Sequence, residues 1–256
     1  MIKRFFSQTK SSVNNRNYHK AKKIQFENRG IVFAQHKTEN LHSLVLPTAT
    51  YSPWLDDQMF QAVYTKVQSH TLVDIFRLYE LFCLTTQLAN NYGDFLEVGV
   101  WRGGSGALLA AVAKTQGKEI FLADTFKGVV KSTHDDSYYS DGEHSDTQAS
   151  IVLKLISELD LDNVTLLEGV FPEQTSNLLQ SKKLAFVHID VDVYQSAKDV
   201  WMHVQPYLTR NSIIVFDDYG FITCSGITKL VNELRSEQGF LFIHNLNGHA
   251  IFVKND

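Results

Sequence analysis

The strongest constraint on the fold is an alternation of short β-branched runs with longer amphipathic stretches, which begins at Asp94. Strands are predicted at residues 94–100, 119–125, 164–170, 184–191 and 212–218. Helices are predicted at 104–115, 147–159, 194–208 and 227–238, with a short helix after Pro172. Strands that alternate with helices at this spacing form right-handed βαβ units, so we expect a parallel sheet.

The C-terminal residues break this alternation. Two apolar runs, 240–245 and 249–254, flank Asn247-Gly248, which is a strong signal for a two-residue hairpin. The last strand is therefore expected to run antiparallel. Five parallel strands followed by a hairpin resemble the class I methyltransferase sheet, in which the seventh strand inserts antiparallel beside the fifth. We predict this α/β, Rossmann-like fold, a seven-stranded and mostly parallel sheet with helices on both faces.

The remaining sequence divides into three parts. Residues 1–30 carry eight basic residues and one acid, Glu27, whereas the rest of the chain is acidic. We expect a basic, flexible leader at 1–44, a helical cap over the cofactor side at 45–92 and the catalytic domain at 93–256. The leader is interpreted as a solvated segment, with a basic arm for an acidic partner or an organelle-targeting segment as alternatives.

Composition limits the environment and the partners. The chain has 256 residues, of which 44% are hydrophobic, so it can form a full core. Two cysteines are too few for a disulfide framework, and no apolar run is long enough to span a bilayer. We expect a cytoplasmic protein that binds neither nucleic acid nor membrane, and we leave a homo-oligomer open.

A glycine-rich turn from Glu97 to Gly106 follows the first predicted strand and opens a helix. Glycines there let backbone N–H groups approach a ligand at a helix N-terminus. Trp101 stands where a dinucleotide fingerprint has its second glycine, and the lysine of a phosphate loop is missing. A tight turn without a ligand is the alternative. Asp124, at the end of the next strand, is the predicted ribose partner.

Two further parallel strands end in pairs of acids, Asp190 with Asp192 and Asp217 with Asp218. Ligands of open α/β sheets bind at the carboxyl ends of the strands, so these four should converge at one rim. Crowded carboxylates repel one another unless a cation holds them, and hard oxygen ligands indicate Mg²⁺ or a similar ion. The alternative, in which they only cap helices, suits one or two of the four.

Two other features border this rim. His188 lies within a predicted strand and is interpreted as a packed or supporting histidine rather than a catalytic one. The polar stretch 128–146 is predicted to form a lid, with Tyr138 and Tyr139 covering a substrate.

Five co-linear segments together resemble the macrocin O-methyltransferase (TylF/MycF-type) family. They are 97–104, 123–128, 169–171, 188–196 and 216–220, and the resemblance extends over about residues 70–256. It implies an S-adenosylmethionine-dependent and Mg²⁺-dependent O-methyltransferase whose acceptor is a small, glycosylated molecule, usually a natural product methylated on a sugar hydroxyl.

The resemblance also implies residue roles. The glycine turn would hold the methionine part of S-adenosylmethionine, and Asp124 the ribose. Asp192, Asp217 and Asp218 would bind the metal and Asp190 would act as general base, although Asp190 and Asp192 can exchange these roles. The implied cofactor-binding residues are Glu97, Gly99, Val100, Arg102, Gly103, Gly104, Ser105, Asp124, Thr125, Phe171 and Asp190.

Three alternatives stay open at this point. A catechol-type O-methyltransferase would use similar metal chemistry on vicinal aromatic hydroxyls. A metal-dependent glycosyltransferase would use Asp190-Val-Asp192 to hold a nucleotide-sugar. A non-catalytic binder would keep the fold, but crowded acids are costly for a protein that gains no chemistry from them.

Overall fold

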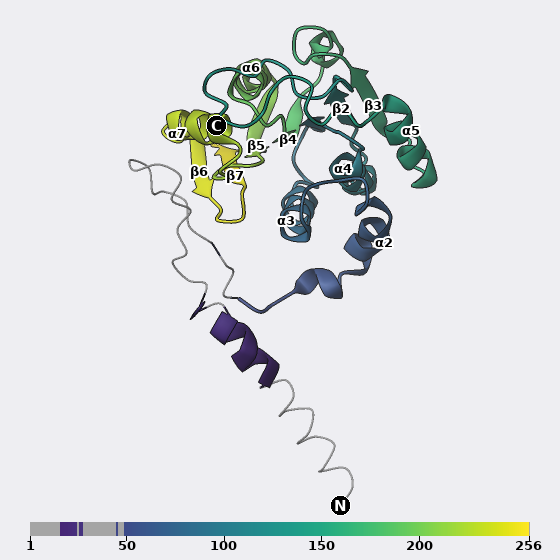
Figure 1. The fold of residues 1–256 in the computed structure, drawn as a ribbon. Coiled ribbons are helices and arrows are strands. Elements are labelled where there is room, and N and C mark those ends of the chain that lie inside the picture. Colours follow the sequence, from purple (N-terminus) through teal and green to yellow (C-terminus); the bar gives the residue numbers. More distant parts are fainter. Residues whose placement is uncertain (1–15, 25, 28–44, 46–48, 256) are drawn as a thin grey trace, which may run out of the picture. The chain divides into compact units, whose positions relative to one another are not determined.

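The computed structural model describes residues 16–24, 26–27, 45 and 49–255 (Figure 1). The chain divides into two compact units, residues 1–52 and 53–256. In the first unit, residues 16–24 and 26–27 are helical and mostly exposed, with an ion pair of 3.5 Å between Lys23 and Glu27. Most of the predicted leader, 1–44, lies outside the described residues.

The second unit contains a seven-stranded sheet in the order β3-β2-β1-β4-β5-β7-β6 (Figure 1). The pairs among β1 to β5 are parallel, and β7 runs antiparallel between β5 and β6. This confirms the predicted sheet and its terminal hairpin. The strands are β1 Asp94–Val98, β2 Ile120–Asp124, β3 Val164–Glu168, β4 Leu184–Ile189, β5 Leu208–Phe216, β6 Phe240–His244 and β7 Ala250–Lys254.

The helices begin and end within a few residues of the predicted positions, and the largest differences, of four residues each, are at the ends of α6 and α7. α7 ends at Leu234 instead of residue 238. α6 ends at Val204 instead of residue 208, because Pro206 follows and disfavours a continued helix. β5 then begins at Leu208, four residues earlier than predicted. The helices are α2 Gln58–Val67, α3 Ile75–Thr86, α4 Gly104–Thr115, α5 Ala149–Glu158, α6 Tyr194–Val204 and α7 Ser225–Leu234, and 3₁₀ turns occur at Pro53–Leu55, Ser176–Leu179 and Gln205–Tyr207.

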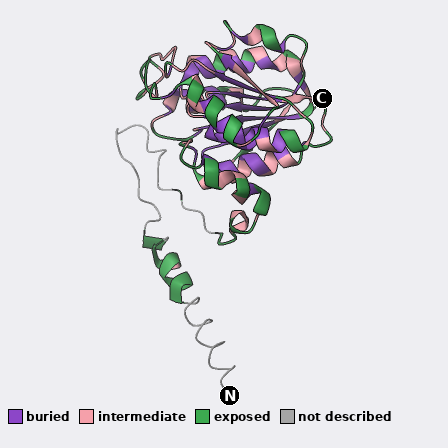
Figure 2. Ribbon diagram, turned by 90° about the vertical axis from the view of Figure 1, so that its right-hand side faces the viewer, coloured by how far each residue is buried: buried purple, intermediate pink, exposed green. Residues whose placement is uncertain are grey.

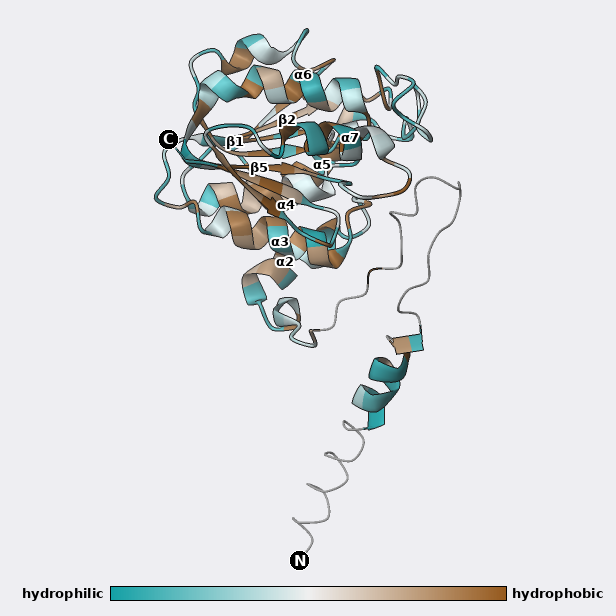
Figure 3. Cartoon of the chain, turned by 90° about the vertical axis from the view of Figure 1, so that its left-hand side faces the viewer, coloured by the Kyte–Doolittle hydropathy of each residue, from teal (hydrophilic) through white to brown (hydrophobic). Residues whose placement is uncertain are grey.

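Alternate residues of each strand point to opposite faces of the sheet, so each face has its own core. Leu96 and Val187 belong to the core that includes residues of α6 and α7. Their neighbours Phe95 and Phe186 belong to the core that includes residues of α4 and α5. The central strands β1, β2 and β4 are therefore buried between two helical layers whose outer faces carry many exposed, hydrophilic residues (Figures 2 and 3), whereas the edge strand β6 is mostly exposed.

α2 and α3 pack on α4 and complete the second of these layers. Phe60 and Leu78 form a buried cluster with Leu108 of α4. Each helix begins at an aspartate that caps it: Asp57 accepts from the Phe60 N–H at 3.0 Å, and Asp74 from the Phe76 N–H at 2.8 Å. The start of α3 is thus fixed beside the carboxyl ends of the strands. No helix in the described part of the chain is both long and apolar enough to cross a membrane.

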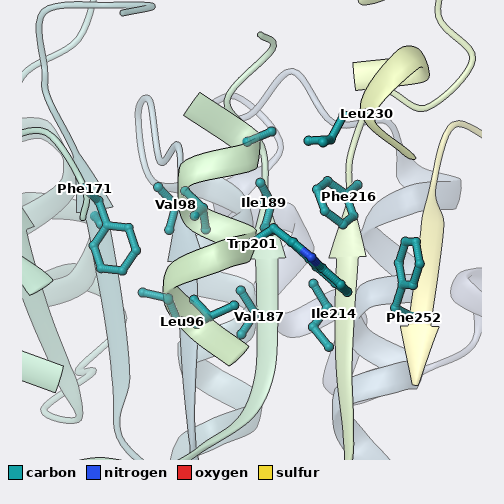
Figure 4. Packing of buried hydrophobic residues seen from close by; sticks show 14 of the residues in the cluster. Leu96, Val98, Phe171, Val187, Ile189, Trp201, Ile214, Phe216, Leu230 and Phe252 are labelled. Atoms are coloured by element: carbon teal, nitrogen blue, oxygen red, sulfur yellow. The ribbon is translucent and has the colours of Figure 1, made fainter. Parts of the chain in front are cut away.

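Trp201 is the large side chain that joins α6 to the C-terminal half of the sheet. It is 1% exposed, and its ring lies 5.0 Å from that of Phe252 and 5.7 Å from that of Phe216, between centroids (Figure 4). We expect Trp201→Ala to lower the free energy of unfolding by about 3–5 kcal/mol, because it leaves a cavity.

Met202, the next residue, is the matched control. It is 63% exposed, so Met202→Ala should change the free energy of unfolding by less than about 0.5 kcal/mol. Urea denaturation of both variants measures the difference, and equal losses would contradict this account of the core.

Candidate functional site

A cavity of about 280 Å³ opens at the carboxyl ends of β1, β2, β4 and β5. All five aspartates predicted for the site line it. The predicted site residues that line it are Gly99, Val100, Ser105, Asp124, Thr125, Phe171, Asp190, Asp192, Asp217 and Asp218. Most of the residues predicted for the site therefore lie at the carboxyl ends of the strands, as expected. Four of the predicted residues do not line the cavity: Glu97, Arg102, Gly103 and Gly104.

The glycine turn brings the end of β1 against the end of β4. Gly99 has a φ of +91°, and a Cβ there would lie 1.7 Å from the backbone oxygen of Asp190. Gly103, with a φ of +88°, caps α4. Gly104 donates its N–H to the backbone oxygen of His70 at 2.8 Å. Gly103 and Gly104 are thus explained by turn geometry and by packing on the segment between α2 and α3, not by a place in the cavity wall.

Asp124 ties the turn to the loop after β2. Its carboxylate accepts hydrogen bonds from the N–H groups of Val100 at 2.7 Å, Trp101 at 2.8 Å and Phe126 at 2.6 Å. A carboxylate has about four acceptor positions, so these three bonds leave room for another donor. The contact of Asp124 with a ribose stays a prediction. What the structure shows is that Asp124 holds the glycine turn in shape through these hydrogen bonds.

Arg102 points away from the cavity. Its Nη2 lies 2.7 Å from Oδ2 of Asp146, and its guanidinium lies over the Trp101 ring, 4.5 Å from the centroid. Trp101 donates its indole N–H to the same aspartate at 2.9 Å. The geometry does not favour the predicted cofactor contact of Arg102; the pair instead fixes the end of the 128–146 segment. The motif gave the residue's position in the chain but not the direction of its side chain.

The segment 128–146, predicted to be a lid, is held on α6 and α7 at several points. Asp136 accepts from the Tyr194 N–H at 2.9 Å, and Asp135 pairs with Lys229 at 2.7 Å. Tyr139 lines the cavity, whereas Tyr138 is 65% exposed. Burial, followed by the charge of Asp192, raises the pKa of the Tyr139 hydroxyl. Of the two predicted tyrosines, only Tyr139 covers the cavity.

The four acids lie where the strand ends predicted them. Asp190 and Asp192 follow β4, and Asp217 and Asp218 follow β5. Asp190, Asp217 and Asp218 each offer a carboxylate oxygen, and these oxygens lie within 4.8 Å of one another. Asp192 forms a second group of the same kind with Asp218 and Cys224.

Crowding changes the protonation of these acids. Burial and then the charges of Asp217 and Asp218 raise the pKa of Asp190 well above its usual value. Burial and Asp218 do the same to the pKa of Asp192. The pKa of Asp218 rises to about 6, through burial and Asp217, although the nearby Arg77 opposes the rise. The cluster therefore holds more negative charge than its surroundings neutralise.

Arg77 of α3 is the functional residue that the sequence analysis missed. Its Nη1 donates to Oδ1 of Asp217 and, at 3.1 Å, to Oδ1 of Asp218. Its Nε donates to Asp74 at 2.9 Å. The residue is 6% exposed. An arginine among the apolar residues of a predicted helix face was the available signal, since a buried charge needs a partner.

His188 and Glu97 lie behind the rim, in the sheet. Nδ1 of His188 lies 2.8 Å from Oε1 of Glu97, and neither residue is exposed. Burial opposes a charged imidazole, but the carboxylates of Asp217 and Glu97 outweigh it and raise the pKa of His188 to about 10. Burial likewise opposes a charged Asp217, yet His249, His188 and Arg77 hold its pKa well below the usual value. His188 supports the site as expected, whereas Glu97 faces this histidine rather than the cavity.

The sequence model of the macrocin O-methyltransferase (TylF) family matches residues 8–253. The chain belongs to this family. It is an S-adenosylmethionine-dependent O-methyltransferase, which decides against the glycosyltransferase and the non-catalytic binder.

Two relatives illustrate the similarity. The chain is 30% identical over 204 residues to the 8-demethyl-8-(2,3-dimethoxy-alpha-L-rhamnosyl)-tetracenomycin-C 4'-O-methyltransferase of Streptomyces olivaceus, covering 73% of this chain and 76% of that protein. It is 29% identical over 187 residues to the mycinamicin III 3''-O-methyltransferase of Micromonospora griseorubida, covering 67% and 72%.

Solved structures share the fold. The O-methyltransferase NovP superposes with a TM-score of 0.62 at 23% identity, covering 73% of this chain and 83% of that one. The calicheamicin methyltransferase CalS11 gives a TM-score of 0.63 at 17% identity, covering 86% and 100%. The sheet and its terminal hairpin are thus those of class I O-methyltransferases.

Gly99 provides a test of the turn. Gly99→Ala should destabilise the protein by more than about 4 kcal/mol or abolish S-adenosylmethionine binding, because the added Cβ overlaps the backbone of Asp190. Calorimetric titration and thermal unfolding measure both effects.

Gly117→Ala is the matched control, since Gly117 also has a positive φ, +64°, but nothing lies within 4 Å of its added Cβ. It should cost only about 1–2 kcal/mol and leave cofactor binding unchanged. Similar losses in the two variants would mean that backbone strain, not the close approach of β1 and β4, explains Gly99.

Proposed function

We propose that this O-methyltransferase depends on Mg²⁺ and methylates a hydroxyl on the sugar of a glycosylated natural product. The observation that carries the proposal is the position of Asp190, Asp217 and Asp218, which share one cavity with the glycine turn and Asp124. A donor pocket and a hard-cation site in one cavity suit transfer of a methyl group to an unactivated hydroxyl.

The donor set suits magnesium. Three carboxylates whose oxygens lie within 4.8 Å of one another offer the hard ligands that Mg²⁺ prefers. The raised pKa values of Asp190 and Asp218 reflect repulsion that a divalent cation would relieve. Arg77 supplies one positive charge to this cluster, which leaves net negative charge for a metal to neutralise.

We assign the roles of Asp190 and Asp192 the other way round from those implied by the family resemblance, with Asp190 as a metal ligand and Asp192 as the general base. The oxygens of Asp190 group with those of Asp217 and Asp218, which supports a ligand role for Asp190. Asp192 lines the cavity and groups with Asp218 but not with Asp190 and Asp217, so it is the better candidate for accepting the hydroxyl proton.

The chain's own residues would align and deprotonate the acceptor. The turn around Gly99 brings the cofactor side of the cavity against Asp190, so that the two reactants meet at the rim. Tyr139 lines the cavity and would shield the acceptor from water. A divalent ion held by the three ligands would lower the pKa of the acceptor hydroxyl. Asp192 would then take the proton as the methyl group moves to oxygen.

The sugar acceptor is supported by the relatives, two of which are named for methylation of glycosylated compounds. The test is transfer of a labelled methyl group from S-adenosylmethionine to an aryl rhamnoside and, separately, to catechol, each with Mg²⁺ and with a chelator. Transfer to the rhamnoside that the chelator abolishes is the expected result. Transfer only to catechol, or transfer unaffected by the chelator, would contradict the proposal.

The two aspartates can be separated by paired variants. Asp192→Asn should lower kcat by about 10²–10⁴-fold and leave metal affinity intact, because only a proton acceptor is lost. Asp190→Asn should weaken the binding of Mn²⁺, followed by electron paramagnetic resonance. If Asp192→Asn lost the metal and Asp190→Asn retained it, this proposal would be wrong, and Asp192 would be the metal ligand and Asp190 the general base.

Metal binding should depend on pH. Asp218 has a pKa of about 6, above its ordinary value, so its negative form destabilises the metal-free fold as pH rises through 6. In acidic solution a metal ion must displace the proton that Asp218 carries before this carboxylate can bind it. In mildly basic solution the carboxylate is already ionised, so no proton has to be displaced. Mg²⁺ should therefore raise Tm more at about pH 8 than at about pH 5, as measured by scanning fluorimetry. Equal shifts at both values would argue against ligation by these acids.

We also propose that the enzyme works in the cytoplasm. The cysteines Cys83 and Cys224 are both free, as a reducing compartment favours.

A further inference from the structure

Three side chains from different strand ends converge behind the acidic rim. His188 lies in β4, Asp217 directly after β5, and His249 directly before β7; each is at most 1% exposed. Nε2 of His188 lies 3.5 Å from Oδ2 of Asp217, and Nε2 of His249 lies 3.7 Å from the same oxygen. None of these three atoms has a hydrogen-bond partner among the described residues. Buried polar atoms without partners are rare and costly, so three that face one another need an explanation.

The other ring nitrogen of each histidine is held by a carboxylate. Nδ1 of His188 lies 2.8 Å from Oε1 of Glu97, and Nδ1 of His249 lies 2.6 Å from Oε2 of Glu80. Glu80 itself accepts from the side chain of Asn247 at 3.0 Å. A carboxylate on one ring nitrogen fixes the imidazole so that the other nitrogen presents its lone pair, which is how metal-binding histidines are usually oriented.

We propose that His188, Asp217 and His249 bind a zinc ion behind the rim, in a second site that shares only Asp217 with the proposed magnesium site. Ligands about 2.0–2.1 Å from a tetrahedral zinc lie about 3.3–3.4 Å from one another, close to the separations of 3.5 and 3.7 Å observed here. Two imidazoles and one carboxylate suit zinc better than magnesium, which prefers oxygen ligands. A site with three protein ligands leaves a fourth position for water.

The charges of the cluster favour a divalent cation. When both imidazoles are neutral, the carboxylates of Glu80, Glu97 and Asp217 that face this cluster have only Arg77 beside them, and Arg77 is shared with Asp218 at the rim. A zinc ion would neutralise this excess and satisfy all three unpartnered atoms at once. It would also join β4 and β5 to the terminal hairpin, and it would hold Asp217 in place for the cavity that Asp217 lines. Two protonated imidazoles are the competing explanation, and the experiment separates them.

The experiment measures the metal content of the full chain, purified without chelators, by plasma mass spectrometry. One zinc per chain is expected in the wild type, and zinc should be lost in His249→Gln. His203→Gln is the matched control, because the Nε2 of His203 is also buried without a partner but stands in no metal-binding group among the described residues. Asp218→Asn should keep zinc while losing Mg²⁺ affinity, which separates the two sites and keeps this inference independent of the proposed magnesium dependence.

A second measurement decides the matter if His249→Gln does not fold. Zinc in the wild type is replaced by Co²⁺, which gives visible absorption bands of a tetrahedral nitrogen and oxygen site if the inference is correct. Folded wild type that contains no zinc, gives no such bands, and has both imidazoles protonated by ¹⁵N nuclear magnetic resonance would overturn it. Retention of zinc by a folded His249→Gln variant would overturn it too.

Discussion

The carboxylate of Asp217 connects the cavity with the interior of the sheet. One of its oxygens faces Arg77 at the rim, and the other faces His188 and His249 behind it. Because this side chain is 1% exposed, its charge must be balanced by protein groups or bound ions rather than by water. α3, β4 and the terminal hairpin each contribute a positively charged or ionisable group that faces Asp217.

The two halves of the cavity are built by different means. The half that we propose binds the methyl donor relies on backbone geometry: Gly99 lets β1 and β4 approach, and Asp124 accepts hydrogen bonds from the N–H groups of the turn. The other half, which we propose binds the metal and the acceptor, relies on charge, with acids from two strand ends opposed by an arginine from a helix that precedes the sheet.

Local sequence signals predicted most of the fold and the outline of the site. Strand and helix periodicities and the Asn247-Gly248 turn predicted the parallel sheet and the terminal hairpin, because each signal lies within a short segment. The position of the last strand beside the fifth came from the resemblance to the class I methyltransferase sheet. The four acids were found because parallel strands end at a common rim.

Contacts between side chains that are far apart in the sequence were not predicted. Arg77 reaches Asp217 across 140 residues, and Glu80 reaches His249 across 169, so no spacing rule links them. A motif gives the position of a residue and not the direction of its side chain, so the contacts of Arg102 with Asp146 and of Glu97 with His188 could not be predicted. The cofactor contacts expected of Arg102, Glu97 and Gly104 stay predictions.

The central claim is that S-adenosylmethionine binds in the half of the cavity formed by the glycine turn and Asp124, beside and separate from the acidic metal site. Calorimetric titration of S-adenosylmethionine into the purified protein, with Mg²⁺ and with a chelator, tests it most directly. Micromolar binding in both conditions is the result this account predicts. No binding of S-adenosylmethionine, together with metal-dependent binding of a nucleotide-sugar, would contradict it.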